Sequence, residues 1–141
     1  MAVFLNNGVG VKINSVDLSD HVKSITLNRN FDELEVTAMG DFSRRYTKGL
    51  ESSTLTLSFL SDTAAASVNA TLQAAWGTSV TFALVQTKGA TTTISATNPL
   101  YTGTILVNKT TDLNGATGDI ATQDITFTVN SVVTVASTGT W

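Results

Sequence analysis

The residues able to carry out acid–base chemistry are few, and most of them lie in one segment. His21 is the only histidine and the chain has no cysteine, so any nucleophile–histidine arrangement would depend on His21. Asp32, Glu33 and Glu35 are candidates for paired carboxylates. Glycosidase pairs face each other across a substrate, whereas three acids along one segment predict no cleft. We therefore expect no catalytic residues and no enzyme.

A second group of polar residues, in the C-terminal third of the chain, does not match a metal-binding site. Asp112, Asn114 and Asp119 surround two glycines, but they lack the spacing of a calcium-binding loop and its closing bidentate glutamate. The pattern indicates a turn, and we expect neither a metal nor a cofactor.

Composition narrows the class of partner. The net charge is −3 with eight lysines and arginines, so tight DNA binding through phosphate contacts is not expected. The start, MAVFLNNGVGVKI, lacks the features of a signal peptide. No run approaches the ~20 apolar residues that span a bilayer. We expect a soluble protein made in a cytoplasm, with no membrane partner.

Alternating polar and apolar residues predict that most of the chain forms strands. The clearest case is Ser53–Leu60, where Leu55, Leu57 and Phe59 alternate with threonine and serine. One helix is expected over about 63–76, with Trp76 on its buried face and Gly77 as its stop. Further strands are expected near residues 9–13, 21–30, 79–87, 101–109, 120–129 and 132–135, with a tight corner at 16–20.

These elements predict a single domain over residues 1–141. The fold class is mainly β: an antiparallel β-sandwich or half-open barrel with one flanking α-helix.

A long connection, residues 29–51, separates two of these strands and holds nearly half of the charges. It is far longer than an ordinary hairpin loop and too apolar for a plain disordered linker. We expect an arm, like a long β-hairpin, that becomes ordered against another protein. Its interleaved apolar residues are Phe31, Leu34, Val36, Met39, Phe42, Tyr46 and Leu50.

The order of these features resembles the major tail protein, or tail tube protein, of long-tailed, non-contractile bacteriophages (siphophages). The likeness is carried by VDLSDHVKSITLNRNFDELEVTAMGDFSRRYTKGLESSTLTLSF, residues 16–59, and above all by VTAMGD at 36–41. Asn98-Pro99-x-Tyr101-x-Gly103 and Gly118-Asp119 also fit the family. The chain is short for the family and lacks an appended immunoglobulin-like domain.

The resemblance implies a structural virion protein located in the tail and assembled in the host cytoplasm. Six copies would form a ring, and rings would stack into a hollow tube that conducts DNA into the host without binding it specifically. Tape measure, tail terminator and tail tip proteins would be its other partners. The arm would contact the adjacent subunit or ring through Phe31, Asp32, Glu33, Glu35, Met39, Asp41, Arg44, Arg45, Tyr46 and Lys48.

Two other readings stay open besides the weaker one of a hydrolase. The chain is compatible with another tail component, such as a terminator or completion protein. It is also compatible with a carbohydrate-binding or adhesive β-sandwich module. That module would need exposed aromatic platforms, for which Tyr46, Trp76, Tyr101 and Trp141 are the candidates.

Overall fold

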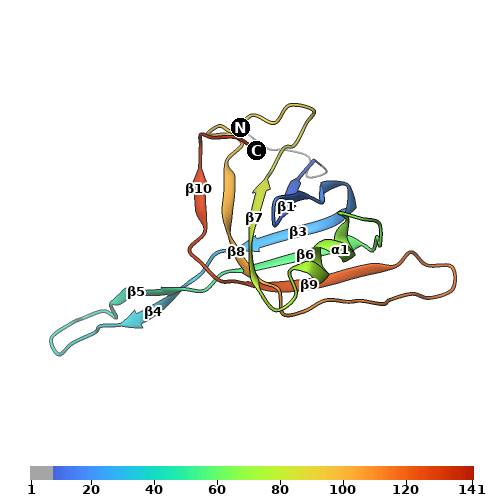
Figure 1. The fold of residues 1–141 in the computed structure, drawn as a ribbon. Helices are drawn as coiled ribbons and strands as arrows, with labels where there is room; N and C mark the ends of the chain where they lie inside the picture. Colours follow the sequence, from blue (N-terminus) through green and yellow to red (C-terminus); the bar gives the residue numbers. More distant parts are fainter. Residues whose placement is uncertain (1–7) are drawn as a thin grey trace.

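Antiparallel strands make up most of the computed structural model, which describes residues 8–141 (Figure 1). This confirms the expected mainly β fold with a single α-helix in the described part. The helix is α1 (Val68–Ala74), and a 3-10 turn covers Ser19–His21. The strands are β1 (Gly10–Ile13), β2 (Val16–Asp17), β3 (Val22–Asn28), β4 (Phe31–Glu35), β5 (Tyr46–Glu51), β6 (Thr54–Leu60), β7 (Ser79–Val85), β8 (Leu100–Leu106), β9 (Thr122–Val129) and β10 (Thr134–Ala136).

One continuous strand path forms the body of the molecule, in the order β2-β1-β7-β8-β9-β6-β3, with β10 also paired to β8. The path bends at β8. Only Ile105 and Leu106 of β8 pair with β9, whereas its other end pairs with β10. The part containing β7 and β8 therefore crosses over the part containing β3, β6 and β9, as Figure 1 shows. The arrangement agrees with the predicted antiparallel β-sandwich or half-open barrel.

The core lies between the two parts and follows the period-2 pattern of the sequence. Leu55, Leu57 and Phe59 of β6 are 0% exposed. Leu55 pairs with Phe127 and Leu57 with Ile125 of β9, and successive side chains of a strand point to opposite faces. Both strands thus bury the same face, and their threonines and serines face outward.

The helix is shorter than the expected 63–76. Ala66 has φ 57°, in the left-handed region, which a helix cannot include. Asp62 accepts a 2.9 Å hydrogen bond from the Ala64 N–H, so its carboxylate closes a separate turn ahead of the helix. The helix begins only at Val68.

The C-terminal side of the helix brings a second correction. The predicted stop, Gly77, has φ 75° but lies beyond the end of the helix, whose C-cap is Ala75. Trp76, expected on the buried face, is 53% exposed. The helix ends at Ala74, so Trp76 no longer lies on the helical stripe that packs against the core.

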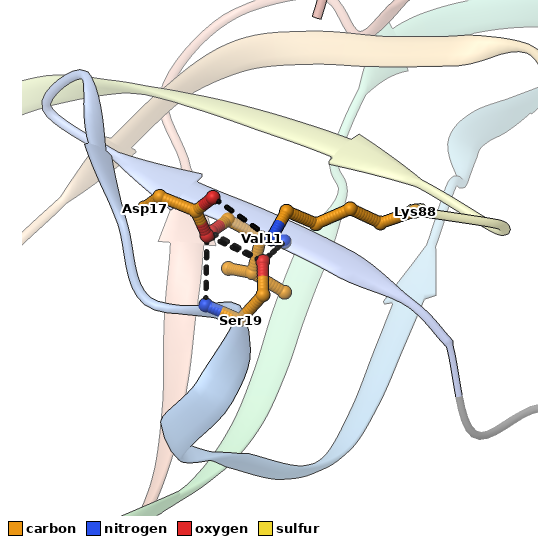
Figure 2. Close-up of polar contacts among 4 residues, drawn as sticks. All are labelled: Val11, Asp17, Ser19 and Lys88. Atoms are coloured by element: carbon orange, nitrogen blue, oxygen red, sulfur yellow. Dashed lines mark hydrogen bonds and ion pairs between the residues drawn. The ribbon is translucent and has the colours of Figure 1, made fainter. Parts of the chain in front are cut away.

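The predicted corner at 16–20 is held by side chains, as Figure 2 shows. The Ser19 N–H donates to Asp17 Oδ1 over 3.0 Å, and the Val11 N–H donates to Ser19 Oγ over 2.9 Å. Lys88 Nζ lies 3.2 Å from Asp17 Oδ2. Burial disfavours the charged carboxylate of Asp17, but the bonds from Ser19 and the nearby Lys88 outweigh it and lower its pKa. The corner is thereby tied to β1 and to the segment after β7.

Candidate functional site: the β4–β5 arm

The arm is a two-stranded antiparallel hairpin that projects from the body of the molecule (Figure 1). Its strands β4 and β5 pair through Glu33 with Lys48, Leu34 with Thr47, and Glu35 with Tyr46. β3 leads into β4 and β5 leads into β6, so the arm prolongs two strands of the main sheet beyond its end.

A tight turn at Met39-Gly40-Asp41 closes the tip of the arm. The Asp41 N–H donates to the Ala38 carbonyl over 3.1 Å. In return, the Ala38 N–H donates to Asp41 Oδ2 over 2.8 Å. Gly40 has φ 93°, which favours glycine at this position. The bonds within the turn therefore give the tip a defined shape of its own.

Two ion pairs join the charged residues near the tip. Arg44 Nη1 lies 3.1 Å from Glu35 Oε2, and Arg45 Nε lies 3.1 Å from Asp41 Oδ2. The arginine side chains are 72% and 59% exposed, and such pairs contribute about 0.2–1 kcal/mol. These pairs orient the side chains more than they stabilise the arm.

Apolar side chains on the arm are uncovered on both faces. Cross-strand register places Phe31 and Tyr46 on one face and Leu34 on the other, and all three are more than half exposed. Lys48 Nζ lies 5.4 Å from the centre of the Phe31 ring. Isolated two-stranded hairpins are marginally stable in water, and exposed apolar patches mark interaction sites.

All ten residues that the sequence predicts at an interface are exposed on this arm. Phe42 is not in the predicted set, although its side chain is fully exposed at the tip. The signal that would have identified Phe42 is an aromatic residue within a polar turn. The ten are distributed as Phe31, Asp32, Glu33 and Glu35 on β4, Met39, Asp41, Arg44 and Arg45 between the strands, and Tyr46 and Lys48 on β5.

The root of the arm is fixed by Glu51, which sequence reasoning also missed. Glu51 Oε1 accepts bonds from Ser53 Oγ at 3.1 Å and from the Val133 N–H at 3.4 Å. Arg29 Nε lies 3.9 Å from the same oxygen. These contacts connect the root of the arm to the link between β9 and β10.

The single histidine has a structural role. His21 Nε2 lies 2.8 Å from Asp62 Oδ2 and joins the 3-10 turn to the end of β6. The hydrogen bond from the Ala64 N–H is the largest contribution that lowers the pKa of the Asp62 carboxyl, and Ser67 and His21 lower it further.

Residues 8–141 contain no group of three or more metal-ligating side chains. None of the helices described is long and apolar enough to cross a bilayer.

The candidate aromatic platforms come from separate places in the fold. Tyr46 is on the arm, Trp76 follows α1, and Tyr101 packs partly buried against the core. Trp141 stacks on Lys12, whose Nζ is 4.5 Å from the ring centre. They do not form the shared surface that a carbohydrate-binding module requires.

No protein-family model matches this sequence, and no curated protein matches it either. Solved structures do match the fold. A chain from the virion of a native gene transfer agent (GTA) particle superposes with a TM-score of 0.73 and 10% identity, over 95% of this chain and 99% of that chain. A chain from the six-fold symmetrised baseplate of the anti-feeding prophage (AFP) gives a TM-score of 0.55 and 12% identity, over 90% and 89%. The fold is thus one found in chains of a virion and of a baseplate.

Proposed function

We propose that this protein is a structural virion protein, the tail tube subunit of a long-tailed, non-contractile bacteriophage. The observation that carries the proposal is that 95% of this chain shares its fold with 99% of a chain of a virion particle. A non-enzymatic role agrees with the likeness to chains of a virion and of a baseplate. One of these chains comes from the virion of a GTA particle and the other from a six-fold symmetrised baseplate, and we extend assembly to this chain.

The uncovered arm supports assembly with further copies. An exposed hairpin with apolar side chains on both faces gains stability when a neighbouring protein covers it. In the proposed tube, the ten interface residues of each arm contact the adjacent subunit or ring. The charges of both signs on the arm set partner and register more than affinity.

Unpaired strand edges support closure into a ring. Within residues 8–141, β3 is the last strand of the path and pairs on one side only, with β6. An open edge of seven residues favours pairing with another chain, and a head-to-tail ring removes such edges. Six copies per ring is the number that we propose.

The outer face of β3, β6 and β9 suits a channel wall for DNA. Thr26, Thr56 and Thr126 form one row across the three strands, and Thr56 Oγ1 lies 3.1 Å from Thr126 Oγ1. In a neighbouring row, Ser58 bonds to Asp124. The carboxylate repels the phosphates of DNA, and neutral hydroxyl groups do not hold them as lysines and arginines would. DNA can therefore slide along such a wall.

Negative-stain electron microscopy of the purified protein over a concentration series tests the proposal. Hollow tubes, or rings that convert into tubes, are the expected result. Rings that never stack would favour a terminator or completion protein. A monomer at every concentration that also fails to polymerise on added tail tips would contradict the proposal and direct attention to glycan binding.

A further inference from the structure

The molecule has two projections, and they lie at opposite ends of the same strand. The arm leaves the sheet where β6 begins, at Thr54. Residues 108–121, which make up most of the connection between β8 and β9, meet the sheet where β6 ends, since Leu60 pairs with Thr122. Figure 1 shows the arm and this connection pointing in opposite directions. Seven residues of strand at about 3.3 Å each separate them by roughly 20 Å.

The 108–121 connection encloses a basin of about 590 Å³ with part of the sheet. Its wall includes Lys23, Leu60, Asp119 and Ile120. Asn114 Nδ2 donates to the Thr122 carbonyl over 2.9 Å. This bond holds the connection against the start of β9 and gives the basin a defined shape.

Apolar side chains are exposed on both projections. At the tip of the arm, Met39 and Phe42 are fully exposed. At the basin, Ile120 is 77% exposed, and Leu113 of the same connection is almost fully exposed. Apolar groups surrounded by polar ones are the pattern of a protein interface, and here each projection offers a surface of that kind.

Each projection carries charges of both signs. The tip has two arginines, each paired with an acid of the arm, Glu35 or Asp41, while the basin wall has Lys23 and Asp119. Arg44 and Arg45 already have acidic partners, but both arginines are more than half exposed. Exposed pairs exchange partners at little cost, so an arginine of the tip is available to Asp119.

We propose that the arm tip of one copy binds the 108–121 basin of a second copy. Met39 and Phe42 of one copy pack against Ile120 of the next, and Arg44 or Arg45 lies near Asp119. Because donor and acceptor surfaces differ and face opposite ways, the contact is head-to-tail and repeats from copy to copy. This inference rests on the proposed self-assembly and identifies the surface that receives the arm.

Complementation between two variants tests this contact. Phe42→Asp damages the donor tip and Ile120→Asp damages the acceptor basin. Both side chains are exposed, so each variant is expected to keep the wild-type circular dichroism spectrum and melting temperature. Each variant is purified and assembled alone, and the two are then mixed in equal amounts and studied by sedimentation velocity.

We expect neither variant to extend beyond its own basic unit, whether that unit is a monomer or a ring. In the mixture, the intact arm of Ile120→Asp binds the intact basin of Phe42→Asp, so the mass doubles and growth stops there. Rescue by mixing cannot arise from misfolded variants, which makes the mixture its own control. The inference is overturned if Ile120→Asp assembles like wild type, or if mixing leaves the mass unchanged.

A cysteine pair gives a second, independent test in a chain without native cysteine. Phe42→Cys and Ile120→Cys proteins, mixed under mild oxidation, are expected to form a disulfide-linked dimer several-fold faster than Phe42→Cys mixed with Trp76→Cys. Equal rates would overturn the inference. If the wild-type protein assembles but the cysteine variants do not cross-link, only the acceptor site is refuted. If the wild-type protein never assembles, the proposed function is refuted as well.

Discussion

Asp17 and Ser19 show how short-range chemistry determines the position of whole strands. Ser19 bonds both to Asp17 and to the backbone of Val11, and Lys88 pairs with the same carboxylate. Such local bonds can be predicted from the sequence, because aspartate and serine two residues apart favour a corner. The ion pair with Lys88 cannot be predicted in this way, since only the pairing of β1 with β7 brings Lys88 close to Asp17.

Replacing Asp17 with asparagine is expected to lower stability in a pH-dependent way. A carboxylate whose pKa is lowered by folding stabilises the protein above its ordinary pKa, and this contribution is lost as the pH falls through the folded-state pKa. We expect Asp17→Asn to cost about 0.5 kcal/mol near neutral pH, a small value because solvent screens this partly exposed group. Urea denaturation should show the difference from wild type disappearing in acid.

Asp20→Asn is the matched control, because Asp20 is exposed and forms no ion pair within residues 8–141. A pH-independent loss for Asp17→Asn, equal in acid and at neutrality, would contradict the assigned role of the carboxylate.

Core packing at Leu57 makes a stronger prediction. Leu57 is 0% exposed and pairs with Ile125, so Leu57→Ala removes buried methyl groups and leaves a cavity. The expected loss is about 3 kcal/mol of unfolding free energy, measured by chemical denaturation. Thr26→Ala, on the outer face of β3, should change stability by about 0.5 kcal/mol or less. Similar losses for the two variants would contradict the assigned inner and outer faces.

Among the elements, strands were more predictable than the helix, for a physical reason. In β6 every second residue is buried, and this period is written directly in the sequence. Alanines at 64–66 read as helix by propensity, yet Ala66 takes a left-handed conformation. The site divides in the same way. Its local hairpin was predictable, but the contact between Glu51 and Val133 spans 82 residues and depends on tertiary packing.

The close packing of the two arm strands predicts a specific effect at Gly49. A Cβ added there would lie 2.8 Å from the Asp32 Cβ and 2.9 Å from its carbonyl oxygen. Gly49→Ala should therefore distort the arm while leaving the melting temperature of the body nearly unchanged. We expect the concentration needed for assembly to rise about tenfold, which corresponds to about 1.4 kcal/mol. It can be measured by light scattering.

Gly89→Ala provides the comparison, because its added Cβ would meet only the Thr91 oxygen at 3.7 Å, an ordinary contact. If Gly49→Ala assembles like Gly89→Ala, the shape of the arm does not matter for assembly.

Removing the whole arm should separate assembly from folding. The Ser52 N–H donates to the Asn30 carbonyl over 2.6 Å, so the two ends lie side by side. A two-residue Asn-Gly turn can therefore replace residues 31–51. The shortened protein is expected to unfold cooperatively but to form no tubes by electron microscopy. Tubes of normal length would contradict a role of the arm in stacking.

On the scale of the whole molecule, one body carries two opposed projections and an open strand edge. Low charge is easier to understand in this setting, since 13% charged residues leave little to keep an isolated surface soluble. A subunit whose surface is largely covered by its neighbours has no such requirement. The low charge and the uncovered arm are therefore both consistent with the proposed assembly.

Cryo-electron microscopy of the assembled protein tests this account most directly. The account predicts a hollow tube of stacked rings, six copies to a ring, with the β4–β5 arm of every copy buried against another copy. Assemblies in which the arms point into solvent, or which have no continuous channel, would contradict it.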